Sequence, residues 1–387
     1  MKTMFISKGL HQTSGAGVGV RMHLSSLEKL VGKENVFIID LLPNGEIIQK
    51  DNYMAFEKYR NALERLYRLS QGNIYLFSNK IIRSICNIIK ENDIKFIFID
   101  DSYYGNLVKK IKKSIPEAIV VCFFHDVKAD LFPKWIRREK KIIRKIDYYL
   151  SIHQEKKSVI WTDANIVLNH TDDDFLKIYY GKKSDFYFPV CIKEESINAK
   201  TPYKENGKLH ILFVGTGYYP NKAGMKWFYD NVFINISHIC DLTIVGKGLE
   251  TLRDDIKDNG VEIIGYADSL IPFYQYADIV VAPLTDGGGM KIKTAEAFAY
   301  GKCFLGTSES LRGYYENIPN EVLNNHIFCC DSPEEYILAI QKIEKNGISK
   351  CNSLVKEIYK QYYSEEAAVR YMKNIIDSTI INKKSEK

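Results

Sequence analysis

Short apolar runs alternate with longer amphipathic segments along the first half of the chain. This alternation predicts strand–helix units that build a parallel sheet. The uninterrupted run Ile97-Phe98-Ile99 fits a strand that is buried on both faces, as a parallel sheet requires. Strands are predicted at Thr3–Ser7, Asn35–Ile39, Ile74–Phe77, Phe96–Asp100, Ala118–Phe123, Ala164–Leu168 and Asp185–Phe188. Helices are predicted at Tyr53–Leu69 and Ile81–Asn92.

A polar stretch from Lys193 to Lys208, with Pro202 and Gly207, interrupts this pattern and predicts a linker. The alternation then resumes. Strands are predicted at Leu209–Val214, Asp241–Val245, Val261–Ile264, Ile279–Ala282 and Cys303–Gly306. Helices are predicted at Lys222–Ile236, Asp268–Tyr276, Lys291–Tyr300, Ser332–Lys345, Ser349–Tyr362 and Glu365–Thr379.

The pattern therefore predicts an α/β protein with two doubly wound, Rossmann-like domains. The N-terminal domain spans residues 1–192 and is completed by the C-terminal helix at 365–387. The C-terminal domain spans 209–364, and residues 193–208 join the two. Ligands of such sheets bind beyond the carboxyl ends of the strands, so we expect the domains to face each other across a cleft that holds the active site.

Length, cysteine spacing and charge limit the classes of protein to which the chain can belong. The length of 387 residues exceeds what one hydrophobic core usually holds. The eight cysteines include no C-x-x-C pair, which gives no indication of a zinc or redox site and suits a reducing cytoplasm. The net charge of +6 is too small to indicate a nucleic-acid partner by itself. The sequence shows neither a signal peptide nor the ~20 apolar residues of a membrane-spanning helix, so we expect a cytoplasmic protein.

The most informative segment runs from Pro283 to Gly301. A buried strand ends at Pro283, three glycines follow, and a helix begins near Met290. Glycines let a backbone approach a ligand closely, and the N–H groups at a helix start attract anions. Lys291 and Lys293 add positive charge suited to a diphosphate, and Glu296 is placed to accept hydrogen bonds from ribose hydroxyls. The alternative is a structural turn followed by a solvated helix start.

This segment resembles the GT-B glycosyltransferases, especially the bacterial glycosyl transferases group one. The resemblance rests on Ala277, Asp278, Pro283, Gly287, Gly289, Met290, Lys293, Glu296, Ala297, Ala299 and Gly301, followed by the strand Lys302–Thr307. Phe213–Gly224 resembles the family's first strand-to-helix turn in this domain, and Trp227-Phe228 stands in the helix after it. Val245–Gly248 and Gly265-Tyr266-Ala267 resemble two further family turns.

The resemblance implies a nucleotide-diphosphate sugar as co-substrate, held mainly by the C-terminal domain. The implied donor-binding residues there are Gly215, Thr216, Gly217, Gly246, Tyr266, Gly288, Gly289, Met290, Lys291, Lys293 and Glu296. Near the N-terminus, the glycine-rich stretch Gly9–Arg21 is similar to the family's first loop, and Gly17 would close over the phosphates. No cofactor and no metal are expected, because a helix dipole and lysines can neutralise the leaving diphosphate.

His125 and Asp126 follow a buried strand and look like the family's His-Asp pair at the carboxyl end of a strand, so we expect a catalytic role in the cleft for both. A structural role for this histidine is the alternative. The sequence departs from many retaining members of the family, because a first glutamate is replaced by Gly288. Retention and inversion of the anomeric centre therefore both stay open. In an inverting reaction Asp126 would be the first candidate for the base, and Asp100 and Asp101 would be the next candidates. In a retaining reaction His125 would contact the sugar.

The segment from Phe132 to Ile146 predicts one basic amphipathic helix. Trp135, Ile136, Ile142, Ile143 and Ile146 share a broad side of this helix. Such a helix can lie on an anionic membrane, and packing of the apolar side on the sheet is the alternative.

Together these features predict a glycosyltransferase that moves a sugar to a hydroxyl of a glycan or a lipid-linked acceptor in bacterial surface polysaccharide or glycoconjugate synthesis. A nucleotide-sugar 2-epimerase of the same fold is a second hypothesis. A catalytically inert binding module is a third, because cleft residues such as the first glutamate are missing.

Overall fold

A computed structural model describes residues 1–12, 15–42, 49–57, 61–73, 77–194, 207–256 and 260–385. The chain forms two compact units. The N-terminal unit combines Met1–Pro189 with Ala368–Lys387, and the C-terminal unit is Val190–Ala367. Of the predicted linker 193–208, residues 195–206 lie outside the described residues.

The N-terminal unit is built on an eight-stranded sheet with the order β3-β4-β2-β1-β5-β6-β7-β8. Its strands are β1 Thr3–Ile6, β2 Val36–Leu42, β3 Gln49–Lys50, β4 Tyr53–Glu57, β5 Phe96–Ile99, β6 Ile119–Phe124, β7 Ala164–Val167 and β8 Phe186–Tyr187. All neighbouring strands are parallel except β3 and β4. Thr3 pairs with Val36 on one side and Phe96 on the other, which aligns the carboxyl ends of β1, β2 and β5.

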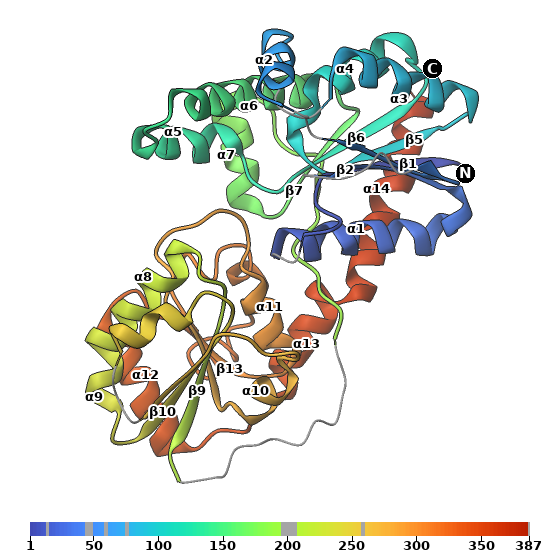
Figure 1. Ribbon diagram of the computed structural model, residues 1–387. Coiled ribbons are helices and arrows are strands. Elements are labelled where there is room, and N and C mark those ends of the chain that lie inside the picture. Colours follow the sequence, from blue (N-terminus) through green and yellow to red (C-terminus); the bar gives the residue numbers. More distant parts are fainter. Residues whose placement is uncertain are drawn as a thin grey trace. The chain divides into compact units, whose positions relative to one another are not determined.

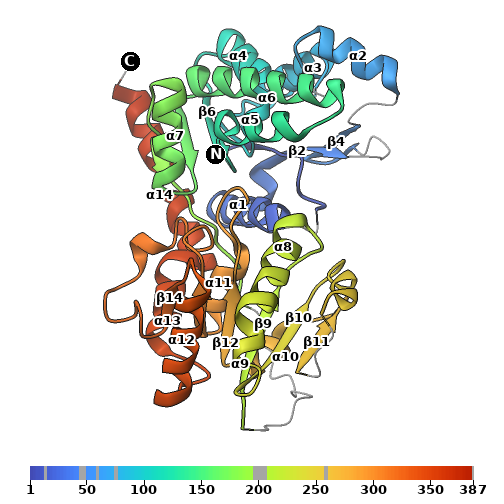
Figure 2. The same cartoon turned by 90° about the vertical axis from the view of Figure 1, so that its left-hand side faces the viewer.

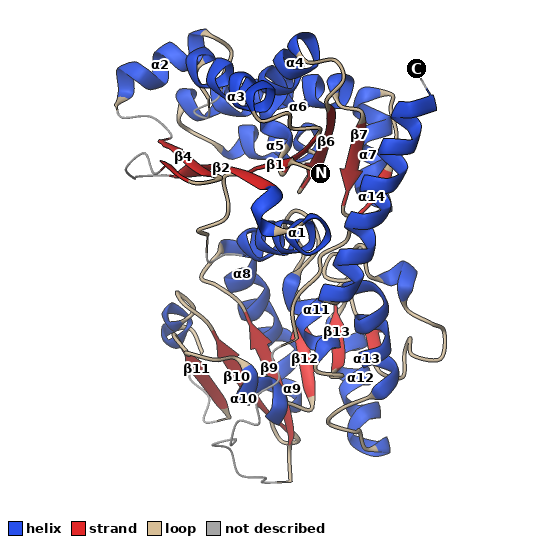
Figure 3. Ribbon diagram, turned by 90° about the vertical axis from the view of Figure 1, so that its right-hand side faces the viewer, coloured by secondary structure: helices blue, strands red, loops and turns tan. Residues whose placement is uncertain are grey.

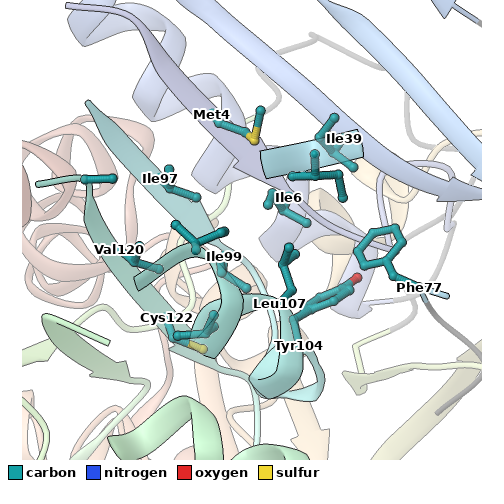
Figure 4. Close-up of a cluster of buried hydrophobic side chains, with 14 of the residues drawn as sticks. Met4, Ile6, Ile39, Phe77, Ile97, Ile99, Tyr104, Leu107, Val120 and Cys122 are labelled. Carbon is teal, nitrogen blue, oxygen red and sulfur yellow. The ribbon is translucent and has the colours of Figure 1, made fainter. Parts of the chain in front are cut away.

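Helices cover this sheet on both faces (Figure 1). They are α1 Gly15–Val31, α2 Ala62–Ser70, α3 Asn79–Glu91, α4 Gly105–Ser114, α5 Lys128–Arg138, α6 Ile142–Trp161, α7 His170–Tyr180 and α14 Glu365–Ser385. In Figure 1, α1 and α14 lie on one side of the sheet, and α3, α4 and α6 lie on the other. The core between the sheet and α3 and α4 is apolar: Ile6, Ile97 and Val120 are fully buried in it together with Leu107 (Figure 4).

Two sequence-based predictions in this unit are wrong. Tyr53–Glu57 is the strand β4, parallel to β2, where a helix is predicted from Tyr53. Its buried Ala55 pairs with Asp40, so a long-range contact overrides the helical spacing. The helix α2 begins only at Ala62, where Asn61 accepts a hydrogen bond from the Glu64 N–H.

The single helix predicted from Phe132 to Ile146 is two helices. The helix α5 ends at Arg138 and α6 begins at Ile142, with extended backbone at Glu139 and Lys141 between them. Glu139 accepts a hydrogen bond from the Lys141 N–H and pairs with Arg144, which stabilises the break. The predicted strand Ile74–Phe77 lies, except for Phe77, outside the described residues.

The C-terminal unit contains a six-stranded, fully parallel sheet with the order β11-β10-β9-β12-β13-β14, whose first five strands lie side by side in Figure 3. Its strands are β9 Leu209–Val214, β10 Cys240–Val245, β11 Val261–Ile264, β12 Ile279–Ala282, β13 Cys303–Gly306 and β14 Ile327–Cys329. The last of these was not predicted.

The helices of this unit are α8 Tyr219–Phe228, α9 Ile234–Ile236, α10 Ile271–Tyr276, α11 Ile292–Ala299, α12 Pro333–Asn346 and α13 Ser353–Ile358. A π-helical segment, Tyr229–Phe233, connects α8 and α9. Figure 1 places α8, α9 and α12 on one face of the sheet and α10, α11 and α13 on the other, and Figure 2 shows α8 and α12 from a second side. Buried side chains of α8 and α12, such as Met225, Phe228 and Tyr336, pack in one core with β9 and β10.

Candidate active site

Two glycine-rich loops lie against each other at the carboxyl ends of β9 and β10. The N–H of Gly215 donates to the Val245 carbonyl at 3.0 Å, and the N–H of Gly217 donates to the Lys247 carbonyl at 2.7 Å. Gly246 has a φ of 142°, and a Cβ there would lie 1.6 Å from the Gly215 carbonyl oxygen. Only glycine permits this approach. Gly215, Gly217 and Gly246, which are predicted from two of the family turns, therefore lie together.

Gly246→Ala is expected to destabilise the C-terminal unit by at least ~3 kcal/mol, because the methyl group must displace the backbone of the Gly215 loop. Urea unfolding of the full chain measures this effect. Gly347→Ala is the matched control: Gly347 also has a positive φ, of 69°, but nothing lies within 4 Å of a Cβ there. That variant should lose only ~1 kcal/mol. Equal losses in the two variants would contradict the packing argument.

Lys293, in the first turn of α11, joins the same loops. Its Nζ donates to Asn221 Oδ1 at 2.7 Å and lies 4.1 Å from the centre of the Phe213 ring. Asn221 in turn donates from Nδ2 to the Thr216 carbonyl at 2.9 Å. Burial lowers the pKa of Lys293 to about 7, with Glu296 opposing the shift and Lys291 adding to it. An anion bound beside Lys293 would therefore favour its charged form.

Glu296 lies one turn further along α11. Its Oε2 accepts a hydrogen bond of 2.7 Å from the Tyr274 hydroxyl, and Tyr274 stacks on Tyr300 with ring centres 4.8 Å apart. Burial and the Glu296 carboxylate raise the pKa of Tyr274 well above its usual value, so the tyrosine stays a donor. This contact fixes the orientation of the carboxylate predicted to bind ribose.

The triple-glycine loop between β12 and α11 is surrounded by charged side chains. Lys291 Nζ donates to the carbonyls of Gly288 at 3.3 Å and Gly289 at 2.9 Å, and to Glu309 Oε1 at 2.6 Å. An Nη of Arg312 lies 3.3 Å from the same Glu309 oxygen and 3.3 Å from the Gly289 carbonyl. Met290 is buried, whereas Tyr266, after β11, is 72% exposed.

The N-terminal unit has its own pocket, at the carboxyl ends of β1, β5 and β6, with a volume of about 260 Å³. Polar side chains and aromatic rings share its wall. The lining residues are Lys8, Gly9, Gln12, Val20, Asp100, Asp101, Tyr103, His125, Asp126, Lys128, Leu131, Phe132 and Trp135. The pocket wall therefore contains both predicted catalytic residues, His125 and Asp126. It also contains Asp100 and Asp101, the two further candidates for a base.

Asp100 connects two histidines at the edge of this pocket. Its Oδ1 lies 2.8 Å from His23 Nδ1 and 3.4 Å from His125 Nε2. Burial by itself would lower the pKa of His125, but the Asp100 and Asp101 carboxylates raise it overall. His125 is partly exposed, whereas Asp100 and His23 are buried. Asp100 can thus hold His125 in a fixed orientation toward the pocket.

Asp101 forms ion pairs with two lysines. Lys8 Nζ lies 2.8 Å from Asp101 Oδ2 and Lys128 Nζ lies 2.7 Å from Oδ1, and both ammonium groups stand over the Tyr103 ring, at 3.4 Å and 4.1 Å from its centre. Burial opposes ionisation of Asp101, but the lysines hold its pKa well below the usual range. Buried Glu155 accepts the Lys128 and Ala129 N–H groups at the start of α5, which fixes Lys128.

Comparisons with known proteins concern the family of one segment and the fold of the whole chain. Residues 208–346 match the model of the family Glycosyl transferases group 1. No curated protein matches the chain. Among solved structures, sucrose-phosphate synthase from Thermosynechococcus elongatus is similar with a TM-score of 0.70 at 13% identity, covering 99% of this chain and all of that one. The chain has the GT-B fold, and its residues 208–346 are similar to the glycosyl transferases group 1 family.

Two further structures support the GT-B fold of this chain. The lipopolysaccharide outer core galactosyltransferase WaaB, solved in its apo form, is similar with a TM-score of 0.69 at 12% identity, covering 98% of this chain and 99% of that one. A glycosyltransferase from Rickettsia africae has a TM-score of 0.65 at 15% identity and covers 98% of both chains. At these identities the likeness shows the fold alone.

In the C-terminal unit, the predicted donor residues Gly215, Thr216, Gly217, Gly246 and Lys293 lie at the two neighbouring loops after β9 and β10. Gly17 lies in the first turn of α1, where a Cβ would come within 2.1 Å of the Gln12 carbonyl oxygen, so local packing already requires glycine there. Its contact with a donor stays a prediction. The sequence-based prediction missed Asn221, Glu309 and Arg312 in the C-terminal unit. In the N-terminal unit it missed Lys8, His23, Tyr103 and Lys128. Lys8 and Tyr103 closely follow strands, which is the signal that could have indicated them.

Neither a metal site nor a membrane span is found in the part of the chain that the structure describes. Within the ranges given above, no three His, Cys, Asp or Glu side chains come together so that they could hold a metal ion. None of the helices described there is both long and apolar enough to cross a bilayer.

Proposed function

We propose that this protein transfers a sugar from a nucleotide-diphosphate donor, bound by the C-terminal unit, to a hydroxyl of a glycan or lipid-linked acceptor bound by the N-terminal unit. The observation that carries the proposal is the convergence of two glycine-rich loops and Lys293 at the carboxyl ends of β9 and β10, with Glu296 one turn further along α11, close enough to influence the charge of Lys293. Glycine-rich loops that a ligand can approach closely, together with the half-buried ammonium of Lys293, suit a diphosphate. The oriented carboxylate of Glu296 suits the hydroxyls of the attached ribose.

In this proposal the diphosphate lies on the N–H groups of Gly288 and Gly289 and beside Lys293, and the ribose hydroxyls donate to Glu296. Negative charge develops on the leaving diphosphate as the bond to the anomeric carbon breaks. Backbone N–H groups and the Lys293 ammonium stabilise that charge without reorganisation. No cofactor and no metal ion take part in the proposed reaction.

The N-terminal pocket supplies the acceptor side. Its volume of about 260 Å³ and its mixed wall of aromatic and charged side chains suit a sugar ring, which has apolar faces and polar edges. His125 and Asp126 lie in this wall, where a general base for the acceptor hydroxyl is needed in an inverting reaction.

Incubation of the full chain with UDP-, GDP- and CMP-sugars, with and without a mixture of glycan and lipid-linked acceptors, tests the proposal. A transferase releases the nucleotide and forms a new glycoside only when an acceptor is present. Conversion of the donor to an epimer without an acceptor would favour the epimerase instead. Absence of turnover with every donor and acceptor would favour the inert binding module.

A role at the cytoplasmic face of a membrane, in bacterial surface polysaccharide synthesis, extends this proposal. Residues 134–145 hold seven basic residues and one acidic residue, a net charge of +6 that equals the net charge of the whole chain. Ile142, Ile146 and Tyr149 form an exposed stripe along the start of α6. Basic residues around exposed apolar ones suit an anionic lipid surface that carries the acceptor.

Sedimentation with vesicles tests this extension. The full chain should bind vesicles that contain phosphatidylglycerol and not vesicles of phosphatidylcholine alone. The double variant Ile142→Ser/Ile146→Ser should lose most of this binding. Ile178→Ser on α7 is the control, because Ile178 is about as exposed as Ile142 but lies outside the basic segment. Equal binding of both kinds of vesicle would contradict the extension.

A further inference from the structure

The triple-glycine loop is held from one side by two cations. The carbonyl of Gly287 accepts from Arg312 at 3.5 Å, that of Gly288 from Lys291 at 3.3 Å, and that of Gly289 from both, at 3.3 Å and 2.9 Å. The two cations share a second acceptor as well, Glu309 Oε1. Lys291, Arg312 and Glu309 thus form one cluster, which we call the loop clamp.

The loop clamp determines where the loop's N–H groups point. In a planar trans peptide the N–H is directed opposite to the C=O. The carbonyls of Gly287, Gly288 and Gly289 share their peptide planes with the N–H groups of Gly288, Gly289 and Met290. Because the carbonyls point toward the clamp, these three N–H groups point away from it. Successive N–H groups on one side of a loop make a concave anion site.

Lys291 itself has little capacity left for a ligand. An ammonium group has three N–H donors, and three protein acceptors lie within 3.3 Å of Lys291 Nζ. Its side chain is only 10% exposed, and Glu309 neutralises its charge at 2.6 Å. Lys293, by contrast, donates to the neutral Asn221 side chain. The two lysines, which the sequence suggests as equivalent phosphate ligands, therefore have different surroundings.

We infer that Lys291 and Arg312, tied together by Glu309, are positioning residues: they turn the N–H groups of Gly288, Gly289 and Met290 toward the donor diphosphate and do not contact it themselves. The inference rests on the proposed function, since it needs a diphosphate at this loop. It assigns Glu309, an acidic residue near an anion site, a favourable role in anion binding.

Glu309→Gln distinguishes a positioning role of Lys291 from direct contact between Lys291 and the phosphates, because the two roles predict opposite changes in affinity for a nucleoside diphosphate. If Lys291 contacted the phosphates, removal of its carboxylate partner would free the ammonium and tighten binding. If Lys291 orients the loop, the loosened clamp weakens binding of a nucleoside diphosphate about three- to tenfold. Binding of the corresponding monophosphate, which makes fewer contacts to the loop, should change less than twofold. Asp230→Asn is the matched control, because it removes the carboxylate partner of Lys226 on an exposed helix face.

The experiment is calorimetric titration of the full-length protein and both variants with UDP, GDP and ADP and with UMP, GMP and AMP. Weaker diphosphate binding by Glu309→Gln alone, with a thermal midpoint within about 2 °C of the unmodified protein, supports the inference. Unchanged or tighter binding overturns it. If the unmodified protein binds none of the six nucleotides, the proposed function fails and not the clamp.

Discussion

Replacement of Lys293 with methionine is expected to weaken the binding of a nucleoside diphosphate by about 30- to 100-fold. The reason is the loss of a half-buried ammonium that lies 2.7 Å from Asn221 Oδ1, beside the two glycine-rich loops. A charge-assisted contact of this kind contributes roughly 2–3 kcal/mol. Calorimetric titration of the full chain with the diphosphate measures the loss. Lys226→Met is the matched control, because Lys226 lies on the exposed side of α8 and pairs with Asp230.

The lowered pKa of Lys293 predicts that the affinity for the donor falls as the pH rises. Burial lowers the pKa of Lys293 to about 7, and a bound diphosphate favours the charged form. Above pH 7 the free protein must therefore take up a proton when the donor binds, and affinity falls as the pH rises. The Kd of a nucleotide sugar should increase by up to about tenfold per pH unit above pH 7. Lys293→Arg, which stays charged, should flatten this profile. A Kd that is constant between pH 6 and 8.5 in the unmodified protein would contradict the charge-based role.

The second large effect is expected for His125. His125→Ala should lower kcat by about 10²- to 10³-fold, whether the imidazole serves as the base or contacts the reacting sugar. Its effect on the Kd of the nucleoside diphosphate should be less than twofold, since that ligand is assigned to the C-terminal unit. His153→Ala is the control, because His153 is exposed on α6. A similar loss of kcat in both variants would exclude a specific role for His125.

Asp100→Asn adds a test of how His125 is positioned. The Asp100 carboxylate, 3.4 Å from His125 Nε2, helps to raise the pKa of that histidine. Its neutralisation should lower this pKa, so the acid limb of the pH–rate profile should move to lower pH if His125 acts as the base. A profile that keeps its position would show that another group, such as Asp126, titrates in that limb.

Much of the C-terminal unit could be predicted from the sequence. Five of its six strands are predicted, and two of them, β12 and β13, are buried along their whole length and read as continuous apolar runs. In the segment from Pro283 to Gly301, the residues that indicate a phosphate site are close together in the sequence. The loop clamp could not be predicted in this way. Lys291 and Glu309 stand 18 residues apart on loops after different strands, and only the pairing of β12 with β13 brings them together.

The N-terminal unit was harder to predict for a similar reason. Tyr53–Glu57 has helical spacing, but its pairing with β2, a contact between distant segments, makes it a strand. Lys8, Tyr103 and Lys128 come from three separate segments and meet around Asp101, although each one stands close behind a strand. Strand ends therefore indicate the region of a site, whereas side-chain partners need the tertiary structure.

The most direct test of the central claim, a nucleotide-sugar site at the loops of β9, β10 and β12, is a thermal-shift screen of the full chain. It compares UDP, GDP, CMP and their sugar conjugates for the unmodified protein, Lys293→Ala and Glu296→Ala. We predict that ligands with one base raise the thermal midpoint of the unmodified protein by several degrees and that both variants lose most of this shift. Stabilisation by no nucleotide, or an equal shift in all three proteins, would contradict the account.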